Sequence, residues 1–154
     1  MGIEIERKFL LRDTSWRSLA DGVQYRQGYL SADVERSVRV RIAGEISTLT
    51  IKGASKGISR EEFEYAIPAS DAIYMLDHLC LKPLIEKKRY RIVVDKLCWE
   101  VDEFFGENSG LILAEVELNC PEQIIQLPDW VGEEVTDDSR YYNASLVKQP
   151  FAYW

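Results

Sequence analysis

The sequence has little of what marks several common functional classes. It contains one histidine and three cysteines, Cys80, Cys98 and Cys120, which form no CxxC pair. We therefore expect reduced thiols rather than a disulfide or a metal site. No apolar run reaches the roughly 18 residues that a bilayer-spanning helix needs. No signal-peptide core follows the charges that begin at Glu4, which predicts a cytoplasmic protein with no membrane role.

Positive charge is also in deficit. The net charge of -7 argues against a broad nucleic-acid or anionic-membrane surface. It leaves room for a small basic pocket, because net charge says little about local potential. No repeat, low-complexity tract or linker divides the 154 residues, so we expect one domain over 1–154.

What the sequence does contain is a strict alternation of charged and apolar residues. Because successive strand side chains point to opposite faces, each such segment gathers its charges on one face. Apolar side chains, such as Ile5, Val40 and Val116, occupy the other face. The charged set comprises Glu4, Glu6, Lys8, Arg39, Arg41, Lys52, Glu62, Glu64, Lys87, Arg89, Arg91, Glu100, Asp102, Glu115 and Glu117.

The alternation predicts an α+β fold dominated by antiparallel strands. Strands are expected over 2–11, 23–31, 36–43, 46–53, 59–68, 85–95, 97–104 and 111–119. Tight turns are expected at Gly44-Glu45 and Asp95-Lys96. Helices are expected over 70–81 and from Asp137 or Asp138 to 148, with a short helical turn over 121–127.

Two architectures fit these strands. A flat antiparallel sheet with one solvated, charged face is common. Eight strands can also close into a barrel whose lumen holds side chains and one small ligand. Solvent faces usually mix neutral polar residues with charges, whereas these positions are almost wholly ionic, and acids and bases fall on separate strands. This separation favours the barrel with a charged lumen.

A lumen of this composition predicts a highly charged ligand. Burying ions is costly unless they are paired or bind a metal. Carboxylate clusters suit Mg²⁺ or Mn²⁺, and arginine and lysine suit phosphate oxygens. Together they indicate a polyphosphate with its divalent metal, as phosphoryl or nucleotidyl transfer requires.

The order of these motifs resembles the CYTH superfamily, also called triphosphate tunnel metalloenzymes, over nearly the whole chain. The resemblance starts at the ExExK signature of Glu4, Glu6 and Lys8. It continues through Arg39-x-Arg41, Lys52, Glu62-x-Glu64, Lys87-x-Arg89, Glu100-x-Asp102 and Glu115-x-Glu117, and ends in the segment 132–143. The short chain, the segment 26–30 and that ending are most similar to the small bacterial members.

The resemblance implies an eight-stranded antiparallel tunnel and a role for each matched residue. The implied metal ligands are Glu4, Glu6, Asp102, Glu115 and Glu117, of which Glu4 and Glu6 are also counted as catalytic. The implied phosphate-binding residues are Lys8, Arg39, Arg41, Lys52, Arg89 and Arg140. Lys87 belongs with them and also with Glu62, Glu64 and Glu100, the lumen residues that pair with and orient the others. Tyr29 matches a tyrosine proposed as proton acceptor.

The resemblance further implies Mg²⁺- or Mn²⁺-dependent hydrolysis of a triphosphate, with inorganic triphosphate as the leading substrate. The alternatives are a class IV adenylyl cyclase, a thiamine or nucleoside triphosphatase, and a non-catalytic polyphosphate-binding module. A homodimer is expected by analogy with relatives. The sole histidine, His78, is expected to have a structural role on its helix. The aromatic C-terminus, which includes Phe151, Tyr153 and Trp154, is expected to dock on the barrel or on a partner.

Overall fold

The computed structural model describes residues 2–154, which form one antiparallel sheet with short helices around it. The strands are β1 Gly2–Leu11, β2 Gly22–Asp33, β3 Arg36–Ala43, β4 Ile46–Gly53, β5 Ser59–Ala66, β6 Ile85–Val94, β7 Leu97–Phe104, β8 Ile112–Glu117 and β9 Val131–Glu134. The first eight match the strands predicted from the alternation to within a few residues. β9 was not predicted, because four residues are too few to show a period.

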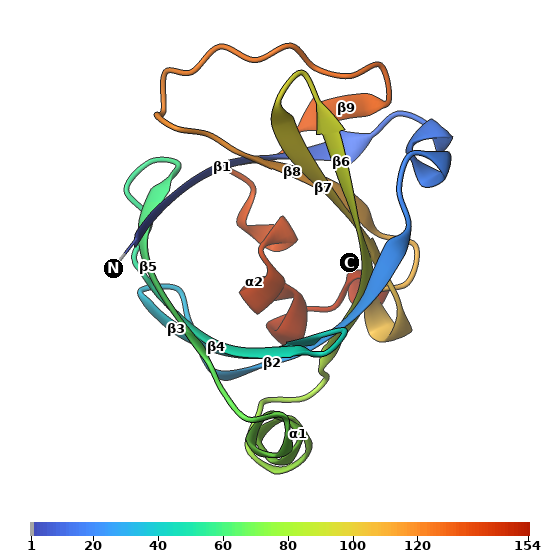
Figure 1. Ribbon diagram of the computed structural model, residues 1–154. Coiled ribbons are helices and arrows are strands. Elements are labelled where there is room, and N and C mark those ends of the chain that lie inside the picture. The colour runs from blue at the N-terminus through green and yellow to red at the C-terminus, as the bar shows by residue number, and fades with distance from the viewer. Residues whose placement is uncertain (1) are drawn as a thin grey trace.

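The sheet closes on itself, as Figure 1 shows in a view down the barrel. The strand order is β5-β4-β3-β2-β6-β7-β8-β1, and β1 then pairs with β5. The long strand β1 makes closure possible, because residues 2–5 pair with β5 and residues 6–10 pair with β8. The predicted eight-stranded barrel is confirmed, and the flat sheet is wrong. β9 pairs with β1 and lies outside this ring.

Two of the hairpins turn where the sequence predicted. Gly44 has φ of 60° in the turn between β3 and β4. Asp95 and Lys96 have φ of 50° and 66° between β6 and β7. Two successive residues with positive φ make a type I′ turn, whose twist matches that of the flanking strands.

The helices differ more from the prediction. Helix α1, Ala69–His78, packs Ala72 and Leu76 against Val40 on the outside of the barrel. The remaining helices are η1 Ser15–Ser18, η2 Gly106–Asn108, η3 Ser139–Tyr141, α2 Asn143–Lys148 and η4 Phe151–Tyr153. No helix among residues 2–154 is long and apolar enough to cross a membrane.

Two helix predictions need correction. The segment 121–127 contains no helix. It runs as irregular chain along the barrel wall, where the partly buried Ile125 packs against the core while Ile124 stays 96% exposed. The predicted C-terminal helix is divided into η3 and α2, because Tyr142 takes an extended conformation with ψ of 136°.

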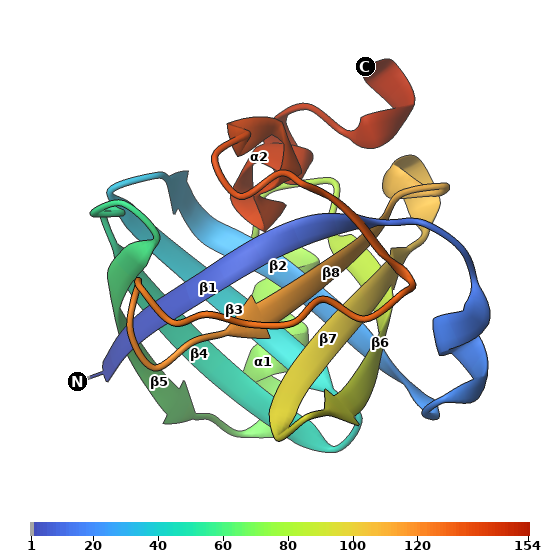
Figure 2. The same cartoon turned by 90° about the horizontal axis from the view of Figure 1, so that it is seen from above.

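The apolar side chains lie outside the barrel wall and at one end of the barrel. On the wall, Phe9, Trp99 and Trp130 stack beneath the segment that leads to β9. At the end, Leu146 and Val147 of α2 pack with residues of β2, β6, β7 and β8. Figure 2 shows α2 at this end of the barrel. The lumen is therefore left to the charged side chains.

The aromatic C-terminus packs against other parts of the same chain, namely η2 and η3. The Trp154 ring lies 5.1 Å from that of Tyr141 and 5.0 Å from that of Phe151. The backbone N–H of Phe151 donates to Asn108 Oδ1 at 2.8 Å. The predicted docking of this tail on the barrel is confirmed.

Candidate active site in the barrel lumen

The lumen holds a cavity of about 480 Å³ that side chains from all eight ring strands line. Residues 136 and 142–144 complete the lining near α2. The sequence-predicted site residues that line it are Glu4, Glu6, Lys8, Tyr29, Arg39, Arg41, Lys52, Glu62, Glu64, Lys87, Arg89, Glu100, Glu115 and Glu117. Two predicted residues, Asp102 and Arg140, are not part of the lining.

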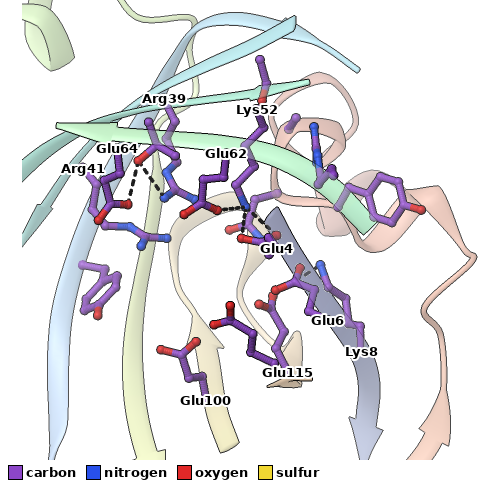
Figure 3. Close-up of a pocket in the computed structure, with 18 of the residues that line it drawn as sticks. Glu4, Glu6, Lys8, Arg39, Arg41, Lys52, Glu62, Glu64, Glu100 and Glu115 are labelled. Atoms are coloured by element: carbon purple, nitrogen blue, oxygen red, sulfur yellow. Dashed lines mark hydrogen bonds and ion pairs between the residues drawn. The ribbon is translucent and has the colours of Figure 1, made fainter. Parts of the chain in front are cut away.

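One wall of the cavity consists of carboxylates. Glu6 of β1 lies directly opposite Glu117 of β8 in the strand register, and Lys8 lies opposite Glu115. Burial, and then the negative charges of Glu115 and Glu4, raise the pKa of Glu6 to about 8. Burial and nearby carboxylates also raise the pKa of Glu117. This wall therefore concentrates more negative charge than its neighbours compensate, as the group of glutamates in Figure 3 illustrates.

The opposite wall consists of cations. Arg39 and Arg41 of β3 point into the cavity (Figure 3). The Arg39 Nη2 atom donates to Thr50 Oγ1 at 3.3 Å, and the Arg41 Nε atom donates to Gln27 Oε1 at 2.9 Å. Within residues 2–154 neither guanidinium has a carboxylate within ion-pair distance. Burial and the charges of Arg39 and Arg89 lower the pKa of Arg41.

Lys52 connects the two walls. Its Nζ atom lies 2.8 Å from Glu4 and 3.5 Å from Glu62. Burial alone would raise the pKa of Glu4, but a hydrogen bond with Glu62 and the charge of Lys52 lower it to about 2. The same hydrogen bond and burial raise the pKa of Glu62 to about 7. Glu4 is therefore the ionised member of this pair at neutral pH, and Glu62 supports it.

Glu64 and Lys8 are held in comparable ways. Glu64 accepts a hydrogen bond from Thr50 Oγ1 at 3.0 Å. The Lys8 Nζ atom donates to the Tyr141 carbonyl at 3.1 Å and lies 3.4 Å from Glu115. Burial would raise the pKa of Glu115, but the charges of Lys8 and Arg89 hold it well below its usual range.

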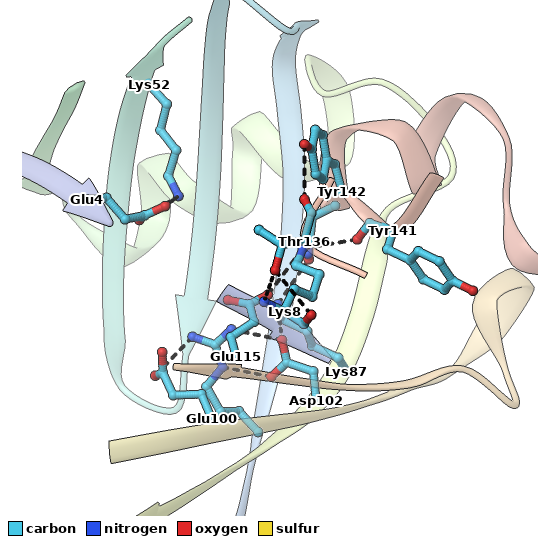
Figure 4. Close-up of polar contacts among 12 residues, drawn as sticks. Glu4, Lys8, Lys52, Lys87, Glu100, Asp102, Glu115, Thr136, Tyr141 and Tyr142 are labelled. Carbon is cyan, nitrogen blue, oxygen red and sulfur yellow. Dashed lines mark hydrogen bonds and ion pairs between the residues drawn. The ribbon is translucent and has the colours of Figure 1, made fainter. Parts of the chain in front are cut away.

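Asp102 lies beneath the lumen surface instead of among the predicted metal ligands. Its two carboxylate oxygens accept from Arg89 at 2.7 and 2.8 Å and from Lys87 Nζ at 2.7 Å (Figure 4). Asp102 and Lys87 are each only 1% exposed. Burial lowers the pKa of Lys87 to about 7, although Asp102 opposes the shift. In this arrangement Asp102 anchors two lumen cations through both of its oxygens, and its role as a metal ligand stays a prediction.

This arrangement predicts that Asp102→Asn lowers stability strongly. Breaking a buried ion pair from one side typically costs about 3–5 kcal/mol, because it leaves buried charge uncompensated. We expect the free energy of unfolding in urea to fall by about 3 kcal/mol or more. The matched control is Glu103→Gln on the next residue, whose partly exposed pair with Arg17 at 2.7 Å should contribute at most about 1 kcal/mol. Equal losses in the two variants would contradict the anchoring role.

Arg140 also lies away from the lumen. Its side chain is 58% exposed and pairs with Asp138 at 2.7 Å. The sequence motif placed it with the phosphate-binding residues, but the extended backbone at Tyr142 separates the turn that carries Arg140 from the part of the C-terminal segment that lines the cavity. Tyr29, the predicted proton acceptor, does line the cavity and lies opposite Arg39 in the strand register.

The sequence reasoning missed several neutral residues around the cations. Tyr25 lines the cavity, and its ring centre lies 4.8 Å from the Arg41 guanidinium and 5.0 Å from that of Arg89. Gln27 is fully buried beside Arg41. Both could have been predicted from strand parity, since Tyr25, Gln27 and Tyr29 are alternate residues of β2 and share one face. Asn143, at the start of α2, carried no such signal because its place depends on tertiary packing.

The donor chemistry of the carboxylate wall fits a divalent cation. Among residues 2–154 the side-chain carboxylates of Glu6 and Glu117 form no hydrogen bond or ion pair of their own, and oxygen ligands of this kind suit Mg²⁺ and Mn²⁺. No three acidic, histidine or cysteine side chains among these residues already converge as a metal site. Glu4 and Glu115 instead pair with Lys52 and Lys8.

Known proteins are similar to this chain in sequence and in fold. The model of the CYTH domain family matches residues 2–149. An inorganic triphosphatase of Acetivibrio thermocellus is 52% identical over 151 residues, covering 98% of this chain and 97% of its own. One of Nitrosomonas europaea is 37% identical, covering 93% and 95%. A crystal structure of an inorganic triphosphatase superposes with a TM-score of 0.67 at 32% identity, covering 93% and 96%.

Proposed function

Because the chain belongs to the CYTH domain family, we propose that it is an inorganic triphosphatase, a hydrolase of acid anhydrides that uses Mg²⁺ or Mn²⁺. The relatives that share this activity cover nearly the full length of the chain. The net reaction adds water to triphosphate, breaks one bridging P–O bond, and releases pyrophosphate and phosphate.

The observation that carries the proposal is the division of one lumen into two oppositely charged walls. In the ring order, β3 and β8 are four strands apart in either direction, so the cations Arg39 and Arg41 face the carboxylates of β8 and β1 across the cavity. In a triphosphate with its metal, the negative phosphates match the cationic wall and the positive metal ion matches the carboxylate wall. An all-cationic pocket would suit a polyphosphate alone, which is why a non-catalytic binding module fits less well.

The proposed roles follow the walls. Glu4, Glu6, Glu115 and Glu117 would hold the metal, which polarises phosphate oxygens and lowers the pKa of water. Arg39 and Arg41 would bind the phosphate chain and neutralise charge that develops on it. Lys8, Lys52 and Arg89 would extend this cationic surface, each already oriented by a carboxylate.

The other lumen residues would support these groups. Glu62 and Glu64 orient Lys52 and Thr50, and Glu100 lies 3.1 Å from Arg89. The role of Tyr29 as proton acceptor stays a prediction. The homodimer expected by analogy also stays a prediction.

Steady-state kinetics with a panel of substrates tests the function. We expect kcat/KM with Mg²⁺ or Mn²⁺ to be about tenfold or more higher for inorganic triphosphate than for ATP or thiamine triphosphate. The reason is that a nucleoside adds bulk at the cavity mouth, while the groups identified in the lumen bind phosphate and metal. No cyclic AMP should form.

Phosphate release with each substrate and a cyclic AMP assay give the two readouts. Faster conversion of ATP to cyclic AMP and pyrophosphate than hydrolysis of triphosphate would favour the adenylyl cyclase. If kcat/KM is higher for hydrolysis of thiamine triphosphate or ATP, the protein is still a hydrolase, but its preferred substrate is not inorganic triphosphate.

A further inference from the structure

Arg41, like Arg39, differs from the other deep lumen cations because no carboxylate holds its side chain. Lys8, Lys52, Lys87 and Arg89 each lie within ion-pair distance of a carboxylate. A carboxylate holds a cation in place, but it also compensates the charge that a phosphate would use. The Arg41 guanidinium is held by a neutral group, the side-chain amide oxygen of Gln27, which accepts from Nε at 2.9 Å.

The choice of nitrogen matters for binding. Because Gln27 occupies Nε, the two terminal nitrogens of Arg41 stay available, and these form the fork that grips two oxygens of one phosphate. Within residues 2–154, the Arg41 side chain makes no other hydrogen bond. The ring of Tyr25 supports the guanidinium plane from 4.8 Å without taking any of its protons.

The orientation of the Gln27 amide is itself determined by its neighbours. Its Nε2 atom donates to Asn143 Oδ1 at 2.9 Å, and the same oxygen accepts from Lys87 Nζ at 3.0 Å. Lys87 is paired with Asp102 and donates this hydrogen bond, so it fixes which end of the Asn143 amide faces inward. Asn143 then fixes the orientation of the Gln27 amide, whose oxygen therefore faces Arg41. Gln27 is fully buried, so no solvent competes for either contact.

We propose that Gln27 is a positioning residue that aims the uncompensated guanidinium of Arg41 at the phosphate chain, and that Asn143 at the start of α2 fixes the direction of the Gln27 amide. This inference rests on the proposed function, since it assumes that the lumen binds triphosphate. An unpaired arginine side chain has several rotatable bonds, and ordering it on binding costs free energy. Gln27 orders it beforehand without reducing its charge.

Binding of inorganic triphosphate in EDTA, measured by isothermal titration calorimetry, separates this role from hydrolysis. Gln27→Met keeps the side-chain volume and removes both hydrogen bonds. We expect its Kd for triphosphate to rise about tenfold or more, as for loss of one hydrogen bond to a charged group. Gln24→Met is the matched control, because Gln24 lies on the same strand with its side chain exposed, and its Kd should be unchanged.

A double-mutant cycle tests whether Gln27 acts through Arg41. In an Arg41→Ala background, Gln27→Met should change Kd less than twofold. An effect as large as in the wild type would overturn the proposal, as would unchanged binding by Gln27→Met alone. If Gln27→Met does not fold, as judged by circular dichroism, Gln27→Asn serves instead, since it stays polar but is one methylene too short to bridge Arg41 and Asn143. Wild-type protein that binds triphosphate only when Mg²⁺ is present would overturn the role of Gln27 and keep the proposed function, and wild-type protein that binds it under neither condition would refute both.

Discussion

Glu6→Gln should reduce metal-dependent hydrolysis of inorganic triphosphate by about three orders of magnitude and leave the fold intact. The substitution keeps the volume and removes one anionic oxygen ligand from the carboxylate wall. Losses on the order of 10²–10³ in kcat are typical when one preorganised electrostatic group is removed from a reaction centre. The measurement is kcat at saturating triphosphate with Mn²⁺, together with Mn²⁺ affinity by titration.

The stability of this variant provides the second readout. The pKa of Glu6 is about 8 in the folded protein against about 4.5 as its ordinary value. The folded state thus holds the proton more tightly, so without metal Glu6 lowers stability progressively as the pH rises from about 4.5 to 8. In EDTA at pH 7, Glu6→Gln should therefore unfold at the same or a higher temperature than the wild type.

The control for Glu6→Gln is Glu61→Gln, because Glu61 is an exposed glutamate of β5 that does not line the cavity. Its activity and Mn²⁺ affinity should match those of the wild type. Retention of full Mn²⁺-dependent activity by Glu6→Gln would show that the metal does not bind at this wall.

Arg41→Ala should raise KM for triphosphate and lower kcat, for a combined loss in kcat/KM of about 10²–10³. The guanidinium would contact phosphate both in the ground state and in the transition state, so both constants should change. Arg41→Lys keeps the charge but loses the two-pronged geometry and the Nε contact to Gln27. We expect Arg41→Lys to recover only a minor part of the loss.

The exposed Arg36 of the same strand is the matched control for Arg41. It forms only a surface pair with Asp33 at 3.4 Å, and Arg36→Ala should retain wild-type kinetics. Full recovery of activity by Arg41→Lys would mean that position 41 contributes charge alone. If Arg41→Ala keeps wild-type KM and kcat, Arg41 does not bind the phosphate chain.

Strand parity explains why so much of this fold was predictable. Charged residues at alternate positions, such as Glu4 with Glu6 and Arg39 with Arg41, fix both the strand and the face that each side chain occupies. Once the ring closes, the same parity places them in one lumen. The helices were less predictable. The sequence shows polar periodicity from 137 to 148, but packing of Leu146 and Val147 on the barrel end determines where α2 begins and ends.

Parity alone could not assign every role. Asp102 and Glu100 share one face of β7, yet Glu100 lines the cavity while Asp102 is buried between Lys87 and Arg89. The ion pairs of Asp102 with Lys87 and Arg89 distinguish the two residues, and such pairing depends on tertiary packing. Arg140 shows the same limit at the C-terminus, where a motif match carries no information on whether a turn points inward.

The division of the lumen into a metal wall and a phosphate wall is tested most directly by a crystal structure with Mn²⁺ and inorganic triphosphate, using Glu6→Gln as the comparison. We predict anomalous manganese density between the glutamates of β1 and β8, with phosphate oxygens on the terminal nitrogens of Arg39 and Arg41. The manganese peak should be weakened or absent in Glu6→Gln. Manganese outside the lumen, or phosphates held without contact to Arg39 and Arg41, would contradict the division of the lumen into a metal wall and a phosphate wall.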